Sequence, residues 1–257
     1  MISNPDNPLN MIPDPFAGNT FVLSETDCTD EQKQFFSRMN EIQAFLFITK
    51  LSFDVCKEKY DRDIIPKLPF KANTIIKLEI NGGNFIATPA AQIIEMTTNG
   101  INLHTRQAFV MFYGSFETYL FQLFEKSFPL VGVTENILDK SRDILMLKKW
   151  DGKFCKMNEA LNIEYKASDL IKWFNNFEMD FEGKKYKNPL NLLDELAQIR
   201  HRIVHASSIL EDDRLIFINI EIFHSLFGFF FLLTDYVDVL FSKKFGYPRT
   251  ALKPSKA

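Results

Sequence analysis

Residues 216–244 constrain the fold most, because this segment is apolar on nearly every side of a predicted helix. Its most apolar part, IFHSLFGFFFLL (222–233), lies between Glu221 and Asp235. These two charges leave too short a segment between them for the ~20 residues that a helix needs to cross a bilayer. The pattern therefore predicts a helix buried at the centre of a bundle, and we expect no membrane span.

The whole sequence predicts a mainly α-helical protein in four parts. Residues 1–30 are rich in proline, asparagine and aspartate and have no periodic pattern, so they predict an irregular arm. Residues 31–99 predict a helix followed by a small β-hairpin, and residues 100–246 predict a helical bundle. A tail follows at 247–257.

Apolar spacing and turn signals place the individual elements. A helix is expected over about 31–60, and β-branched runs around an Asn-Gly turn predict the hairpin over 75–88. Two further helices are expected over about 101–128 and 189–208. Shorter helices joined by polar loops are expected over 140–188.

Charge and cysteine content narrow the class of protein. The net charge of -3 provides no overall basic field that would indicate nucleic-acid binding, although a local basic cleft would be enough. Cys28, Cys56 and Cys155 contain no CxxC pair, so reduced thiols are expected rather than a disulfide framework. The polar, proline-broken first residues do not resemble a signal peptide. We therefore expect a cytoplasmic protein.

An arginine on an apolar helix face provides the first indication of a site. Arg200 falls in the middle of that face on the helix over 189–208. The apolar residues of this face are Leu192, Leu193, Leu196, Ala197, Ile203 and Val204. A buried arginine is costly unless it is paired, so it requires a carboxylate. Glu117 lies on the apolar stripe of the helix over 101–128 and is the predicted partner.

Two neighbours of Glu117 leave this pairing open. The hydroxyl of Tyr113, one turn earlier, is placed to add a hydrogen bond to the same cluster. Arg106 lies on the same side and could compete for the role of Arg200. The alternative is that Glu117 sits at the edge of the stripe and reaches water.

The polar side of the helix over 189–208 carries Asp194, Gln198, His201 and His205. Histidine exchanges protons near neutral pH, and beside an arginine it suits phosphodiester cleavage. The arginine would steady the charge on the phosphorane. Two alternatives use the same residues: His201 and His205 cover a dimer surface without catalysis, or they chelate a metal ion with Asp194 as third ligand.

The motif in this helix resembles that of a known family. RHRIVH (200–205) matches the Arg-x4-His motif of the HEPN superfamily, and LLDELAQIRHRIVHAS (192–207) resembles its motif-bearing helix. FYGSFETYLFQLFEK (112–126) is similar to the earlier helix, which often carries an acidic residue facing the motif. The resemblance is to bacterial HEPN ribonucleases and toxins, and it covers about residues 100–245.

This resemblance implies a HEPN-like helical bundle that cleaves RNA without a metal or other cofactor, at a composite site formed by two protomers. Arg200 would stabilise the phosphate, His205 would transfer protons, and Glu117 would support Arg200. His201 departs from the small polar residue that is common at its position. The resemblance also implies a toxin or antiphage-defence role, with a cognate antitoxin or defence protein as partner. Some family members are instead non-catalytic modules that dimerise or bind RNA or protein.

A basic segment offers contacts to the RNA substrate. In LKKWDGKFCK (147–156), Lys148, Lys149 and Lys153 could hold phosphates while Trp150 stacks on a base. The alternative is a solvated helix end with a buried tryptophan.

Overall fold

A computed structural model describes residues 27–63, 75–80, 84–175, 177–181, 183–205, 218 and 220–251. Within these residues the protein is mainly α-helical, as predicted. The helices are α1 (Asp30–Asp63), α2 (Ala90–Ser127), the 3-10 helix η4 (Phe128–Val131), α3 (Ile137–Leu145), α4 (Trp150–Leu161), α5 (Ala167–Trp173), α6 (Pro189–His205) and α7 (Ile220–Phe245). The strands are β1 (Asp27–Cys28), β2 (Ile75–Ile80), β3 (Asn84–Pro89), β4 (Met179–Phe181), β5 (Lys184–Tyr186) and β6 (Thr250–Ala251).

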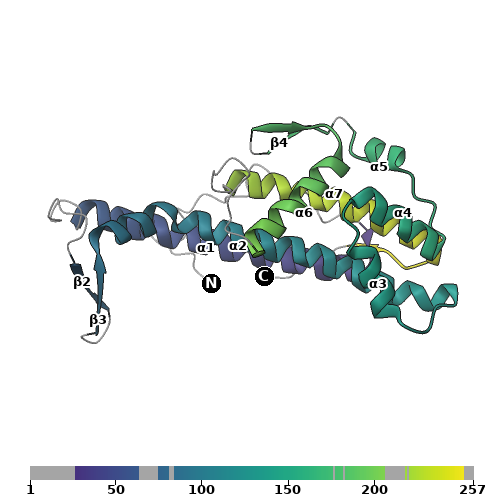
Figure 1. Ribbon diagram of the computed structural model, residues 1–257, viewed down its shortest axis with the longest axis horizontal. Helices are drawn as coiled ribbons and strands as arrows, with labels where there is room; N and C mark the ends of the chain where they lie inside the picture. Colours follow the sequence, from purple (N-terminus) through teal and green to yellow (C-terminus); the bar gives the residue numbers. More distant parts are fainter. Residues whose placement is uncertain are drawn as a thin grey trace, which may run out of the picture.

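Helices α1 and α2 form a long pair that extends beyond the rest of the bundle (Figure 1). The predicted hairpin lies at the far end of this pair, with β2 and β3 antiparallel from Ile75 opposite Pro89 to Ile80 opposite Asn84. Gly100 permits close packing of the two helices, since a Cβ at this position would lie 2.7 Å from the ring of Phe53. The other helices gather at the opposite end of the pair (Figure 1).

Helix α7 lies in the core of the bundle, as its apolar sequence predicted. It is long and apolar enough to cross a membrane, but most of its apolar stretch is buried inside the bundle. Aromatic rings supply much of the contact with α2: the Phe230 centroid lies 5.0 Å from that of Phe112 and 5.1 Å from that of Phe116. Both contacts are edge-on, an arrangement that aromatic pairs favour.

Two sequence predictions about the N-terminal half are corrected. Helix α2 begins at Ala90, not near residue 101, so the expected division at residue 100 falls inside a continuous helix. The sequence TTNG (97–100) has low helix propensity, and packing against α1 overrides it. The second correction concerns α1, which was expected in a region separate from the bundle. It shares the core of the bundle, where Phe35 and Met39 are fully buried.

The segment that predicted only short helices and loops also contains a hairpin. Strands β4 and β5 pair from Met179 opposite Tyr186 to Phe181 opposite Lys184, with Gly183 at a φ of 74°. Phe181 is fully buried, which anchors the hairpin to the core. Strands of three residues are too short for an alternating pattern to reveal them.

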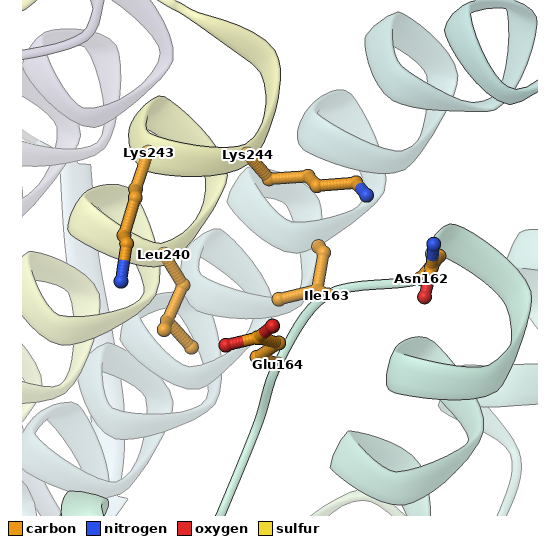
Figure 2. Close-up of a pocket in the computed structure, with 6 residues that line it drawn as sticks. All are labelled: Asn162, Ile163, Glu164, Leu240, Lys243 and Lys244. Atoms are coloured by element: carbon orange, nitrogen blue, oxygen red, sulfur yellow. The ribbon is translucent and has the colours of Figure 1, made fainter.

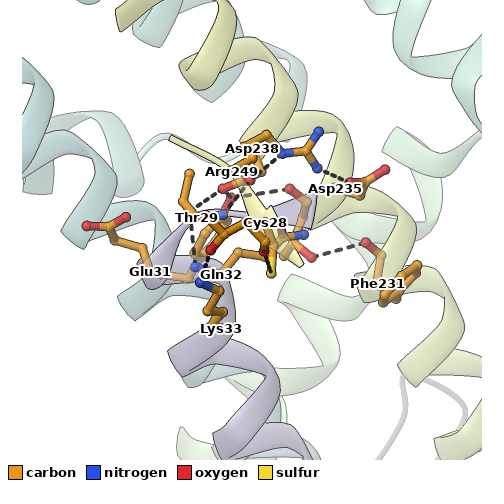
Figure 3. A network of polar contacts seen from close by, with 12 residues as sticks. Cys28, Thr29, Glu31, Gln32, Lys33, Phe231, Asp235, Asp238 and Arg249 are labelled. Carbon is orange, nitrogen blue, oxygen red and sulfur yellow. Dashed lines mark hydrogen bonds and ion pairs between the residues drawn. The ribbon is translucent and has the colours of Figure 1, made fainter. Parts of the chain in front are cut away.

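Strands β1 and β6 pair the two ends of the described chain beside α7 (Figure 3). The fully buried carboxylate of Asp238 accepts hydrogen bonds from the backbone N–H of Thr29 at 3.0 Å and from its hydroxyl. It also accepts from the Tyr119 hydroxyl at 3.3 Å and from Arg249 Nε at 3.0 Å, while Arg249 Nη2 donates to Asp235 at 2.6 Å. Part of the predicted tail is therefore bonded to the bundle. The expected arm is described only from residue 27 onwards.

Candidate functional site

Helix α6 begins where the sequence indicated. Pro189 occupies its first position, and the Asn188 side-chain oxygen accepts a hydrogen bond from the Leu190 N–H at 2.9 Å. This cap satisfies a backbone donor that the first turn leaves unpaired. The helix is described as far as His205, so its predicted end at 206–208 lies outside the described residues.

The buried face of α6 differs by a small rotation from the predicted one. Leu192, Leu196 and Ile199 are buried, whereas Val204 is 46% exposed. This rotation places Arg200 at the edge of the apolar face rather than in its middle. The guanidinium can therefore reach both the core and the solvent.

Arg200 pairs with Glu117 on α2, as predicted. Arg200 Nη2 lies 3.7 Å from Glu117 Oε2, and the two side chains are 34% and 28% exposed. At this distance the contact is an ion pair without a hydrogen bond. Arg200 Nε is buried and has no hydrogen-bond partner in the described structure. The arginine is thus held loosely, and its buried Nε donor is unsatisfied in the described structure.

Among the described contacts, neither Tyr113 nor Arg106 forms the interaction with Glu117 that the sequence left open. The Tyr113 hydroxyl accepts a hydrogen bond from the indole Nε1 of Trp150 at 2.9 Å, and no described hydrogen bond joins it to Glu117. Burial first, and then the Glu117 carboxylate, raises the pKa of Tyr113. Arg106 forms no described ion pair with Glu117, and burial lowers its pKa.

Trp150 is unavailable for stacking on a base, which corrects the prediction for this residue. It is 1% exposed and forms part of the core. Its backbone N–H donates to Asp194 Oδ1 at 2.8 Å, so the carboxylate of α6 caps the first turn of α4. The alternative interpretation, a helix end with a buried tryptophan, describes this residue correctly.

Lys153 is also buried rather than exposed to bind phosphates from solvent. It is 6% exposed, and its Nζ lies 4.2 Å from the centroid of the Trp150 ring. Burial lowers the pKa of Lys153, and the carboxylates of Glu117 and Asp194 oppose this effect. Only Lys148 and Lys149, of the four predicted RNA-binding residues, are exposed.

His201 and His205 lie exposed on the outer side of α6, next to each other. Their ring centroids are 4.7 Å apart and the ring planes are inclined by 46°. Asp194, the proposed third metal ligand, instead caps α4. The described residues contain no group of three side chains placed to hold a metal ion. The histidine pair therefore faces solvent on the helix that also carries Arg200.

Two hollows in the described surface lie apart from this cluster. Figure 2 shows the first, of about 240 Å³, between the end of α4 and α7; it is lined by Asn162, Ile163, Glu164, Leu240, Lys243 and Lys244. The second, of about 450 Å³, has an apolar lining that includes Phe128, Ile144 and Leu147. No predicted catalytic residue lines either hollow.

Nothing in the sequence indicated that Lys153 and Asp194 belong with the Arg200–Glu117 pair. One signal was present for Lys153, because it shares a helical face with the apolar residues Trp150, Phe154 and Met157. Comparisons with family models, with curated proteins and with solved structures find no match to this chain.

Proposed function

We propose that this protein is a metal-independent endoribonuclease of the HEPN type, acting as a toxin or in antiphage defence in the cytoplasm. The observation that carries the proposal is an exposed pair of adjacent histidines on the same helix as an arginine that is loosely held by a carboxylate. His201 and His205 are adjacent in space, and Arg200 keeps a buried Nε donor without a partner in the described structure. This combination provides the groups that cleavage of a phosphodiester requires.

The cleavage is an attack by the ribose 2′-oxygen on the adjacent phosphorus. His205 accepts the proton of the 2′-hydroxyl, or returns a proton to the departing 5′-oxygen, as a general base or acid. Arg200 stabilises the negative charge that develops on the phosphorane. The products are a 2′,3′-cyclic phosphate and a 5′-hydroxyl. Side chains supply the proton transfers and stabilise the charge, so the proposed reaction needs no metal ion or other cofactor.

The exposed side chains of α6 support the idea that a second protomer completes the site. His201, His205 and Val204 are all exposed on α6, and Val204 provides an apolar contact next to the two rings. We propose a homodimer in which two copies of α6 face each other and enclose the substrate. A cognate antitoxin or another defence protein would bind the same face or control access to it.

The exposed Val204 also favours the competing function, a non-catalytic HEPN module that dimerises or binds RNA or protein through α6. Both functions use the same helix face, but they differ in chemistry. In the binding module, Arg200→Ala and His205→Ala would alter association and no RNA would be cut.

The test is cleavage of a mixed RNA pool by purified protein in EDTA. We expect Arg200→Ala to lower the rate by roughly 10²–10³-fold and His205→Ala by roughly 10²–10⁴-fold. The matched controls are Arg142→Ala, which removes an exposed arginine from α3, and Asn191→Ala, which changes an exposed position on α6. If folded wild-type protein leaves the pool intact, the binding module is the better interpretation.

A further inference from the structure

Lys153 is a buried cation without a described carboxylate in ion-pair contact. The residue is 6% exposed, and the described contact of its Nζ is the face of the Trp150 indole at 4.2 Å. A cation–π contact of this kind compensates only part of the cost of burying an ammonium group. This indole packs against both α2 and α6, because its centroid lies 5.2 Å from that of Phe116, the residue before Glu117, and the Trp150 N–H donates to Asp194. The charge of Lys153 therefore depends on the carboxylates of these two helices.

Glu117 and Asp194 are those carboxylates, and they differ in how firmly they are fixed. Asp194 Oδ1 accepts the Trp150 N–H at 2.8 Å, so the first turn of α4 holds it in place. Glu117 is 28% exposed and contacts Arg200 at 3.7 Å without a hydrogen bond. Both carboxylates favour the charged form of Lys153, whereas Arg200 opposes it. Glu117 is thus the carboxylate that can move between the two cations.

We propose that Arg200 and Lys153 share Glu117, and that Lys153 takes over this carboxylate when Arg200 binds a phosphodiester of RNA. In the free protein Glu117 neutralises the charge of Arg200. An arriving phosphate competes with Glu117 for the guanidinium. Lys153 then provides the counter-charge for the displaced carboxylate, which lowers the cost of the exchange. Lys153 acts as a positioning residue. This inference rests on the proposed function only in taking RNA as the ligand.

The test is a double-mutant cycle on binding, using a short fluorescent RNA in which every 2′-hydroxyl is replaced by fluorine. This RNA cannot undergo the proposed cleavage, so the result does not depend on nuclease activity. Full-length wild type, Lys153→Met, Glu117→Gln and the double variant are compared by fluorescence anisotropy. Lys156→Met is the matched control, because it removes one exposed lysine from the same helix.

We expect Lys153→Met to weaken binding at least about fivefold, the lower end of typical coupling between linked sites. Glu117→Gln in that background should restore the wild-type affinity, since no carboxylate then has to be displaced. Loss of packing alone would not be rescued in this way. Glu117→Gln by itself should bind at least as tightly as wild type, which tests the exchange even if Lys153→Met folds poorly.

Several results would overturn the exchange: no binding by wild type, unchanged binding by Lys153→Met, a double variant as weak as Lys153→Met, or a fivefold loss in Glu117→Gln. An equal loss in Lys156→Met would do the same, because it would show a general charge effect. If the double-mutant cycle gives the expected affinities and RNA is never cut, the exchange of Glu117 is supported and the proposed nuclease function is refuted. If RNA is cut and the cycle does not give these affinities, the nuclease function is supported and the exchange is refuted.

Discussion

Arg249→Met should destabilise the protein by removing the cation between two carboxylates of α7. Arg249 is 22% exposed and donates to Asp235 at 2.6 Å and to the fully buried Asp238 at 3.0 Å. Breaking a buried ion pair from one side costs about 3–5 kcal/mol, and partial exposure of the arginine places this case near 3 kcal/mol. For a chain of this length the loss corresponds to a decrease of roughly 6–12 °C in Tm.

The loss should depend on pH with a definite sign. Burial already raises the pKa of Asp235 and Asp238, while Arg249 acts to lower both. Without Arg249 the two pKa values rise further, so the folded variant binds protons more readily than the unfolded chain. The contribution of these two carboxyl groups to its stability is then greatest in acid and is lost as the pH rises through their raised pKa values. The deficit of the variant should be largest near neutral pH and shrink towards about pH 5.

Urea denaturation of wild type and variant at both pH values measures this deficit. Arg142→Met is the matched control, since Arg142 is 66% exposed in its pair with Asp139 and its loss should change stability by less than about 0.5 kcal/mol. A deficit below about 1 kcal/mol at neutral pH, or one that grows in acid, would refute the role assigned to Arg249.

Three further outcomes test the packing. Trp150→Phe should lower the free energy of unfolding by about 1 kcal/mol in urea through loss of its indole hydrogen bond to Tyr113; an unchanged free energy would contradict the role of this bond. In a Cys56→Ser background, a thiol reagent at about pH 8 should label exposed Cys155 and spare Cys28, because burial raises the pKa of Cys28 to about 11. Mass spectrometry identifies the labelled site. Labelling of Cys28 before Cys155 would contradict the burial of Cys28. Gly114→Ala should raise the free energy of unfolding by about 0.5–1 kcal/mol in urea, because its added Cβ meets no atom within 4 Å; a loss would indicate a clash.

Local sequence signals predicted the elements of the bundle and one tertiary contact. Pro189 indicated the start of α6, and a charge on each of two apolar stripes was enough to pair Arg200 with Glu117. The energetic reason is general, since an arginine at the edge of a core requires a carboxylate. Because only one acidic residue lay on the facing stripe, the pairing could be inferred without knowledge of the fold.

The surroundings of this pair could not be predicted, because they depend on how α4 packs against α2 and α6. The sequence around Trp150 is compatible with either an exposed basic strip or a buried aromatic residue. Tertiary contacts decide between them: the indole N–H meets Tyr113, and the backbone N–H meets Asp194. Burial of Lys153 follows from the same packing. The projection of α6 from the sequence was also rotated slightly, so it placed Val204 on the buried face, although this residue is 46% exposed.

The most direct test of the central claim is whether cleavage requires the ribose 2′-hydroxyl at the scissile bond and no metal ion. After one cleavage site has been mapped in EDTA, the same RNA is prepared with a single 2′-deoxy substitution at the nucleotide that precedes this bond. The proposed chemistry predicts that wild-type protein cuts the unmodified RNA to a 2′,3′-cyclic phosphate end and leaves the substituted bond intact. Cleavage of both RNAs at equal rates, or no cleavage of either by folded dimeric protein, would contradict it.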